Sequence, residues 1–183
     1  SCDSASNKGV HTNTPEDSHN LVQYADNFKI YKYKSGYKLE IKNKNSSNFD
    51  EFYIFNDSLD IPEEIKNQTI IRTPIKSAIA FSSTQWSVFQ KLGEINVIKG
   101  ILESNYSKND EILRLVKEDV IIDLGTSNQV NTEKVINLKA ELILYTPYPT
   151  IDYSNLGKLS GSIMIPFPDY LESHPLGRAE WMK

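Results

Sequence analysis

Between residues 75 and 167, short apolar runs alternate with helical segments, and this alternation limits the possible folds more than any other feature of the sequence. Apolar runs predict strands over residues 75–81, 95–98, 120–122, 141–145 and 162–167. Helices are predicted over residues 86–92, 110–116 and 131–138, with Asn109 and Asn131 as caps, and a further helix begins at Pro175. Strands that alternate with helices at this spacing favour a parallel sheet with helices on both faces. We therefore predict an α/β fold with a Rossmann-like parallel sheet.

The preceding segment, residues 21–69, has a different period. Apolar and polar side chains alternate over residues 28–33 and 37–42, with Ser35-Gly36 between them, which predicts a β-hairpin. Residues 52–55 predict another strand. Lysines interleaved with tyrosines also occur in proteins that stack single-stranded nucleic acid. We favour a half-buried sheet with its lysines in solvent, because the alternation places them on one face.

Charge and motifs exclude several classes of protein. Twenty basic and 24 acidic residues give a net charge of −4 with no basic stripe, which argues against a nucleic-acid binder. No apolar run reaches the roughly 18 residues that would cross a bilayer. The sequence contains no nucleotide-binding glycine loop, no HExxH and no GxSxG, and one cysteine with three histidines predicts neither a catalytic triad nor a metal site. We therefore predict a protein that is not an enzyme and has no intrinsic cofactor.

Residues 1–20 are rich in Ser, Asn and Asp and are predicted to be a flexible tether. A chain that begins Ser-Cys-Asp-Ser looks like a mature bacterial lipoprotein, in which a cysteine next to the cut signal peptide is acylated. This resemblance implies a lipid anchor on Cys2 and a location in the cell envelope (periplasm). The alternative is an incidental free cysteine in the tail.

Residues 70–183 contain a series of short segments in a characteristic order. They are Arg72-Thr73-Pro74, Ser82-Ser83-Thr84, Leu92-Gly93, residues 97–100, residues 122–125, and the N-x-E segment 131–143. In this order they resemble the substrate-binding proteins of ABC importers for iron-siderophores, haem and vitamin B12, although Ala140-Glu141 replaces the family's Pro-Asp. These proteins are clamshells in which one rigid helix joins two lobes. The ending HPLGRAEWMK is similar to the start of the interlobe helix. The resemblance implies a binding lobe over residues 70–173 and the start of an interlobe helix over 174–183, with 21–69 as an added β-element.

In an open α/β sheet, ligands sit outside the carboxyl ends of the strands. Large flat ligands suit aromatic rings that also carry hydroxyl groups. The alternative for Tyr145 and Tyr148 is that they merely cap the sheet. The predicted lining consists of Ser83, Thr84 and Gln85, within the polar segment 82–85, together with Tyr106, Tyr145, Tyr148 and Phe167.

The resemblance implies a lipoprotein that captures an iron chelate, haem or corrinoid and delivers it to an ABC permease and its ATPase. In this family the first lobe presents a glutamate to the permease, and the matching residue here is Glu133. The main alternative is a lipid-anchored scaffold that keeps the fold without ligand transport. A weaker one is an enzyme on a Rossmann-like sheet, since fold alone does not fix function.

Overall fold

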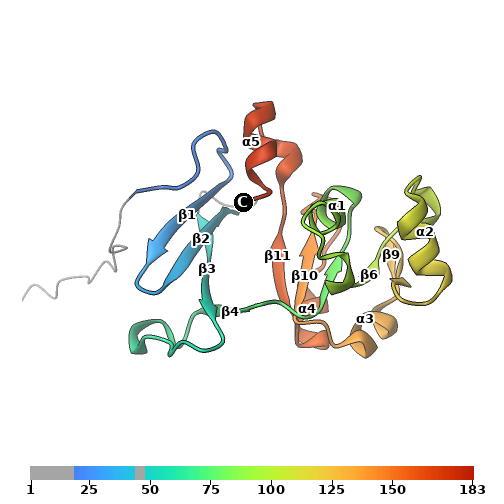
Figure 1. The fold of residues 1–183 in the computed structure, drawn as a ribbon, viewed down its shortest axis with the longest axis horizontal. Helices are drawn as coiled ribbons and strands as arrows, with labels where there is room; N and C mark the ends of the chain where they lie inside the picture. Colours follow the sequence, from blue (N-terminus) through green and yellow to red (C-terminus); the bar gives the residue numbers. More distant parts are fainter. Residues whose placement is uncertain (1–18, 44–47) are drawn as a thin grey trace, which may run out of the picture.

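Two sheets lie side by side along the long axis of the protein, and the C-terminal helix lies above the junction between them (Figure 1). The computed structural model describes residues 19–43 and 48–183. The first sheet is formed by the N-terminal segment and the second by the rest of the chain. One hydrophobic cluster runs through both, from Phe28 and Phe52 in the first sheet to Ala80 and Leu144 in the second.

The first sheet has four strands and includes the predicted hairpin. Its strands β1 and β2 are joined by a two-residue turn in which Lys34 has a φ of 49°. Strand β3 pairs antiparallel with β2, and β4 pairs parallel with β3. Strand β4 lies across the boundary that the sequence analysis set between residues 69 and 70. The strands are β1 (Phe28–Tyr33), β2 (Gly36–Lys42), β3 (Phe49–Asn56) and β4 (Thr69–Thr73).

The prediction that the hairpin lysines face solvent is wrong for Lys38. This side chain is buried, with 6% of the residue exposed, and its Nζ lies 2.8 Å from carboxylate oxygens of both Glu40 and Glu51. Burial would lower the pKa of Lys38, but its bonds to the two glutamates outweigh this effect and raise the pKa to about 12. The face of the first sheet that carries Lys38 is covered and not open to solvent. On this face Tyr33, Tyr53 and Phe55 pack against Ile65, which lies in the loop before β4.

The second sheet is parallel throughout, as predicted, with the order β11-β10-β5-β6-β7. From the central strand β5 the chain builds outward to β7. It then returns to the other side of β5 for β10 and β11, so the direction of winding reverses between β5 and β10. The strands are β5 (Ala78–Ala80), β6 (Ile98–Ile101), β7 (Ile122–Asp123), β10 (Leu142–Tyr145) and β11 (Ile163–Pro166), and a small hairpin of β8 (Gly125–Thr126) and β9 (Gln129–Val130) follows β7.

Helices cover both faces of this sheet. Alternate residues of a strand point to opposite faces. Accordingly, Ala78 and Ala80 join the cluster that contains Trp86 and Ile112, from α1 and α2. Ile79 joins the cluster that contains Val135 and Leu156, from α3 and α4. The helices are α1 (Ser83–Lys91), α2 (Asp110–Lys117), α3 (Thr132–Leu138), α4 (Ser154–Ser160) and α5 (Pro175–Glu180), and the 3-10 turns are η1 (Glu63–Ile65), η2 (Ile95–Val97), η3 (Ser104–Tyr106) and η4 (Asp169–Leu171).

Several helices and strands of the structure begin at residues other than those predicted from the sequence. Helix α1 begins at Ser83 instead of residue 86, because the Gln85 Oε1 atom accepts hydrogen bonds from the backbone N–H groups of Phe81 and Ser82. Residues 95–97 form the turn η2, and the strand follows at Ile98. Helix α4 was not predicted. Its Gly157 lies so close to β11 that an added Cβ would stand 2.5 Å from the Met164 Cγ, so a residue that normally weakens a helix is required there.

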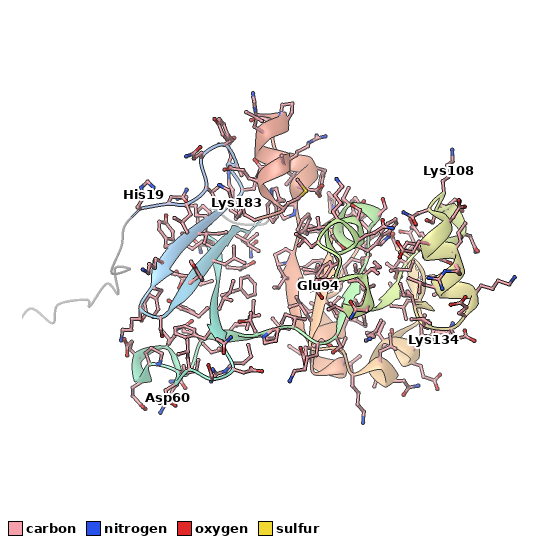
Figure 2. The ribbon with its side chains drawn as sticks, in the orientation of Figure 1. His19, Asp60, Glu94, Lys108, Lys134 and Lys183 are labelled. Carbon is pink, nitrogen blue, oxygen red and sulfur yellow. The ribbon has the colours of Figure 1, made fainter. Side chains whose placement is uncertain are left out.

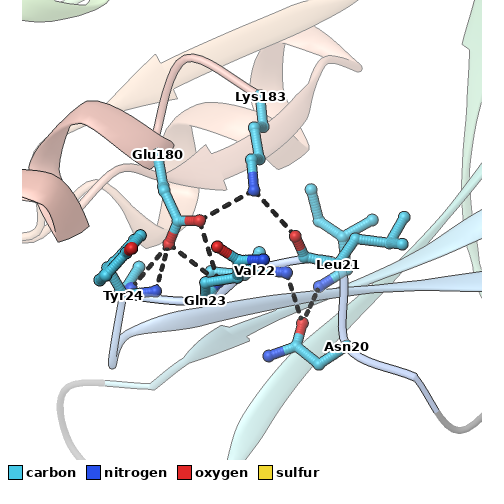
Figure 3. Close-up of polar contacts among 9 residues, drawn as sticks. Asn20, Leu21, Val22, Gln23, Tyr24, Glu180 and Lys183 are labelled. Atoms are coloured by element: carbon cyan, nitrogen blue, oxygen red, sulfur yellow. Dashed lines mark hydrogen bonds and ion pairs between the residues drawn. The ribbon is translucent and has the colours of Figure 1, made fainter.

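Helix α5 is tied to the N-terminal segment by a buried carboxylate (Figure 3). Glu180 accepts hydrogen bonds from the backbone N–H groups of Gln23 at 2.9 Å, Tyr24 at 2.6 Å and Ala25 at 2.9 Å. The Lys183 Nζ donates to the same carboxylate at 2.8 Å. Charge-assisted hydrogen bonds of this kind are among the stronger ones in proteins.

A second buried carboxylate continues this attachment. Glu172 accepts from the backbone N–H groups of Asp26 at 2.8 Å and Asn27 at 3.1 Å, and from the Trp181 Nε1 at 2.9 Å. The Trp181 ring packs between Phe28 of β1, at 4.4 Å between ring centroids, and Phe167 after β11, at 4.7 Å. Helix α5 and the residues on either side of it therefore hold the two sheets together through polar and aromatic contacts.

We expect Glu180→Gln to destabilise the chain by about 1–3 kcal/mol at pH 7, because an amide loses the charge that strengthens these bonds. Burial would raise the pKa of Glu180, but the hydrogen bonds from Lys183 and from Gln23, Tyr24 and Ala25 outweigh it and lower the pKa from its ordinary 4.5 to about 2. The stability from this depressed pKa is fully present above pH 4.5 and is lost as the pH falls towards 2.

Urea unfolding at pH 7 and across this acid range measures both effects. Glu180→Gln should unfold at lower urea at pH 7 and show a flatter acid dependence than the unmodified chain. Glu118→Gln is the matched control, since Glu118 forms an exposed ion pair with Arg114. Equal behaviour of the two variants would contradict the role given to Glu180.

Candidate functional site

A cavity of about 230 Å³ opens at the carboxyl ends of β5 and β10, where the strand order reverses. This reversal point is the general ligand position in doubly wound sheets, because the loops on either side diverge there. We call it the switch-point cavity. Its lining consists of Phe81, Ser82, Ser83, Trp86, Ile101, Leu102, Glu103, Ser104, Tyr106, Ser107, Ser127, Thr146, Tyr148 and Tyr153.

Gln85 lies beneath the cavity and connects the two loops at its centre, one after β5 and the other after β10. Its Oε1 atom accepts from the Ser82 N–H at 3.0 Å, and its Nε2 donates to the Thr146 Oγ1 at 3.2 Å. The residue is 1% exposed. Buried polar groups need partners of this kind, and a complete set fixes their geometry. Gln85 therefore positions the turn after β5 against the segment after β10.

The loop after β6 forms a polar wall. Glu103 lies in the left-handed backbone region with a φ of 58°, and its N–H donates to the Gly125 carbonyl at 2.7 Å. The Glu103 Oε1 accepts from the Ser127 Oγ at 2.6 Å. Asp123 accepts from the Gly125 N–H at 2.7 Å and from the hydroxyl of Ser104. The wall therefore presents hydroxyl groups and one exposed carboxylate to the cavity.

Tyrosines dominate the opposite side. The Tyr153 ring makes an edge contact with Phe81 at 5.0 Å, and its hydroxyl donates to the Ser127 carbonyl at 3.0 Å. Burial, with smaller contributions from Tyr148 and Glu103, raises the pKa of Tyr153 to about 12, so this hydroxyl keeps its proton. Tyr148 packs 5.9 Å from Tyr170 and is 43% exposed.

Two exposed aromatic rings flank the cavity. Tyr106 is 79% exposed and follows β6, whereas Tyr148 follows β10. Because β5 lies between these two strands, the two loops stand on either side of the turn that begins α1. An exposed aromatic side chain on each side of a hydroxyl-rich floor can contact the faces of a ring-containing ligand.

Two further hollows adjoin the cavity and share Tyr153 with it. One, of about 420 Å³, is lined by Tyr145, Pro147, Tyr148, Asp152 and Met164 among others. The other, of about 230 Å³, extends over Ser127, Thr132, Ile151 and Leu159. Typical small-molecule sites occupy roughly 300–1,000 Å³. A ligand that used all three hollows would fall within that range.

The structure brings together only part of the predicted lining. Ser83, Tyr106 and Tyr148 surround the switch-point cavity, and Tyr145 lines the adjoining hollow. Gln85 is buried beneath the cavity. Thr84 and Phe167 lie instead on a separate groove beside α5.

The segment from Tyr145 to Tyr148 was predicted to line the site, and its Thr146 does line the cavity, but sequence reasoning missed Phe81, Trp86, Glu103 and Tyr153. Phe81 directly follows β5, so its place in the chain was a usable signal. Glu103 and Tyr153 enter the lining through long-range loop packing, for which the sequence offers no local mark.

The other predicted sites lie apart from the cavity. Glu133 is exposed in the first turn of α3, and no ion pair within the described residues includes it. Cys2 lies outside the described residues.

No group of three or more metal-ligating side chains occurs in residues 19–43 and 48–183. None of the helices in the described part of the chain has the length and apolar character needed to span a membrane.

No family model matches the chain. It is 28% identical over 178 residues to an uncharacterized lipoprotein of Methanocaldococcus jannaschii, a match that covers 90% of this chain and 42% of the relative. The chain thus spans less than half the length of this curated relative.

Two solved structures are similar at low sequence identity. The iron uptake ABC transporter substrate-binding protein PiuA from Streptococcus pneumoniae has a TM-score of 0.43 and 16% identity, covering 58% of this chain and 37% of that one. The petrobactin-binding protein YclQ from Bacillus subtilis has a TM-score of 0.49 and 15% identity, covering 79% and 42%.

Proposed function

We propose that this chain is the substrate-binding lobe of an ABC importer, which captures an iron-siderophore, haem or corrinoid and delivers it to a permease and its ATPase. The observation that carries the proposal is the switch-point cavity, flanked by the exposed rings of Tyr106 and Tyr148. It lies where a doubly wound sheet binds ligands. The order of the sequence segments that resemble this family supports the same function.

The shape of the site fits one wall of a larger binding site. The cavity, at about 230 Å³, is smaller than a typical ligand pocket, and the two hollows beside it share Tyr153 with it. In a clamshell binder a second lobe supplies the other wall, and residues 174–183 would begin the helix that leads to it. We propose residues 70–173 as the binding lobe and residues 21–69 as an added element packed against it.

We also propose that Cys2 carries a lipid anchor in the cell envelope, with residues 3–20 as the spacer. The relative that matches most of this chain is named a lipoprotein. One acyl chain binds a membrane only marginally, whereas several anchor a protein durably. Mass spectrometry of the native protein tests this: a lipid mass on Cys2 is expected, and a free thiol would refute it.

Tyr148→Ala should weaken binding of the transported ligand by about 1–2 kcal/mol, roughly ten-fold, because one exposed aromatic contact is removed. Calorimetric titration of the native protein with a ferric siderophore, haem and cobalamin measures this. Tyr24→Ala is the matched control, since Tyr24 is similarly exposed but lies beside His174 at the far junction. If no ligand of the three classes bound, the lipid-anchored scaffold would become the better explanation.

We propose that Glu133 docks on the permease. It is exposed at the start of α3, where the helix dipole favours a carboxylate, and the described residues offer it no ion-pair partner. Glu133→Ala should leave ligand affinity nearly unchanged and impair uptake in cells that depend on the importer. Glu111→Ala, which changes an exposed first-turn glutamate of α2, is the control. If affinity and uptake fell in proportion, Glu133 would belong to the binding site instead.

A further inference from the structure

We infer that the ligand of this site is neutral or positively charged as a whole, so that anionic iron chelates and haem are disfavoured. The inference rests on the proposed function and narrows its ligand class. It is carried by the charged residues around the switch-point cavity and its two adjoining hollows. The only charged side chains in these linings are Glu103 and Asp152, and both are acidic.

Basic side chains of the described residues line the groove beside α5, where Lys91 and Arg178 occur, but they are absent from these three linings. The described residues, 19–43 and 48–183, include 18 of the chain's 20 lysines and arginines, yet none of these 18 lines any of the three hollows. Recognition of carboxylate or catecholate oxygens ordinarily uses arginine or lysine side chains as hydrogen-bond donors with positive charge. On this wall, the side-chain donors are uncharged: they are hydroxyl groups, the Trp86 indole N–H and the amides of Asn128 and Asn155.

Both carboxylates are fixed by local hydrogen bonds that leave an oxygen for a ligand. Glu103 uses Oε1 to accept from Ser127, and the described residues place no donor on its Oε2. Asp152 uses Oδ1 to accept from the Ser154 N–H at 2.8 Å. Hydrogen bonding by Ser154 lowers the pKa of Asp152, which keeps this carboxylate ionised at neutral pH.

Nearby lysines do not offset this charge at the cavity. Lys108 follows the lining residue Ser107, but its side chain extends away from the body of the protein (Figure 2). Lys134 already has a hydrogen-bond partner at the edge of the sheet, because its Nζ donates to the Asp123 carbonyl at 2.9 Å. The charged side chains that line the hollows are therefore the two carboxylates, and like charges on a ligand would be repelled.

The aromatic rings add to the same preference. Tyr106 and Tyr148 present electron-rich faces, which attract cationic groups and also pack against neutral flat ligands. A trihydroxamate iron chelate with a free ammonium group has these properties, as does a neutral corrinoid. A tris-catecholate iron chelate carries three negative charges, and haem carries two propionates, so both meet only acidic side chains here.

Titration of the native protein with four probes tests the inference. The probes are ferrioxamine B as the cationic chelate, cyanocobalamin as the neutral corrinoid, ferric enterobactin as the anionic chelate, and haemin. We expect the tightest probe to be ferrioxamine B or cyanocobalamin, at least ten-fold tighter than either anionic probe. Preferential binding of an anionic probe would overturn the charge inference and uphold the proposed function. Absence of binding by all four would overturn both.

The double variant Glu103→Gln with Asp152→Asn isolates the charge, because each amide oxygen can still accept the local hydrogen bond. It should bind ferrioxamine B more weakly and ferric enterobactin more tightly, by about three- to ten-fold in each case. General damage to the site would weaken both probes together, which would count against the inference. Glu118→Gln, on the outer side of α2, should change neither affinity.

Discussion

The parallel pairing of β5 with β10 places the two loops of the site next to each other, although they are more than 60 residues apart in the sequence. The Phe81 N–H donates to the Leu144 carbonyl at 3.1 Å and so extends this pairing to the point where both strands end. Gln85 then joins Ser82 to Thr146 just beyond it. The cavity, its aromatic flanks and its hydroxyl floor all depend on this junction. Its geometry comes from the backbone, and the loop side chains supply its chemistry.

The N-terminal sheet is integrated with this lobe and shares its core. Glu172 and Glu180 accept hydrogen bonds from the backbone N–H groups of residues 23–27. Trp181 fills the space between the sheets. A charged residue is rarely buried unless several donors surround it. The two carboxylates therefore make the position of α5 specific as well as stable.

The features that the sequence predicted are those fixed by local chemistry. Asn109 and Asn131 cap α2 and α3 by accepting from the N–H groups three residues later, at 3.1 and 3.0 Å, and both were recognisable as caps. The parallel sheet followed from the order of apolar runs and helices. The Rossmann-like winding in turn predicted a ligand site at the carboxyl ends of the strands, and the structure has the switch-point cavity at this position.

The features that the sequence did not predict depend on contacts between distant segments. Lys38 is buried only because a loop from residues 57–68 covers its face of the sheet. Gln85 looked like a ligand contact, but Thr146 turns it into a support beneath the cavity. Helix α4 contains a glycine that its packing on Met164 requires. No local pattern records these long-range contacts.

A crystal structure of the native protein with its tightest-binding probe would test most directly whether the switch-point cavity is the ligand site. The probe should lie against Tyr106 and Tyr148, with hydrogen bonds to hydroxyl groups of the loops after β5 and β6. A probe bound on the N-terminal sheet, or in the groove lined by Thr84 and Phe167 beside α5, would contradict this assignment.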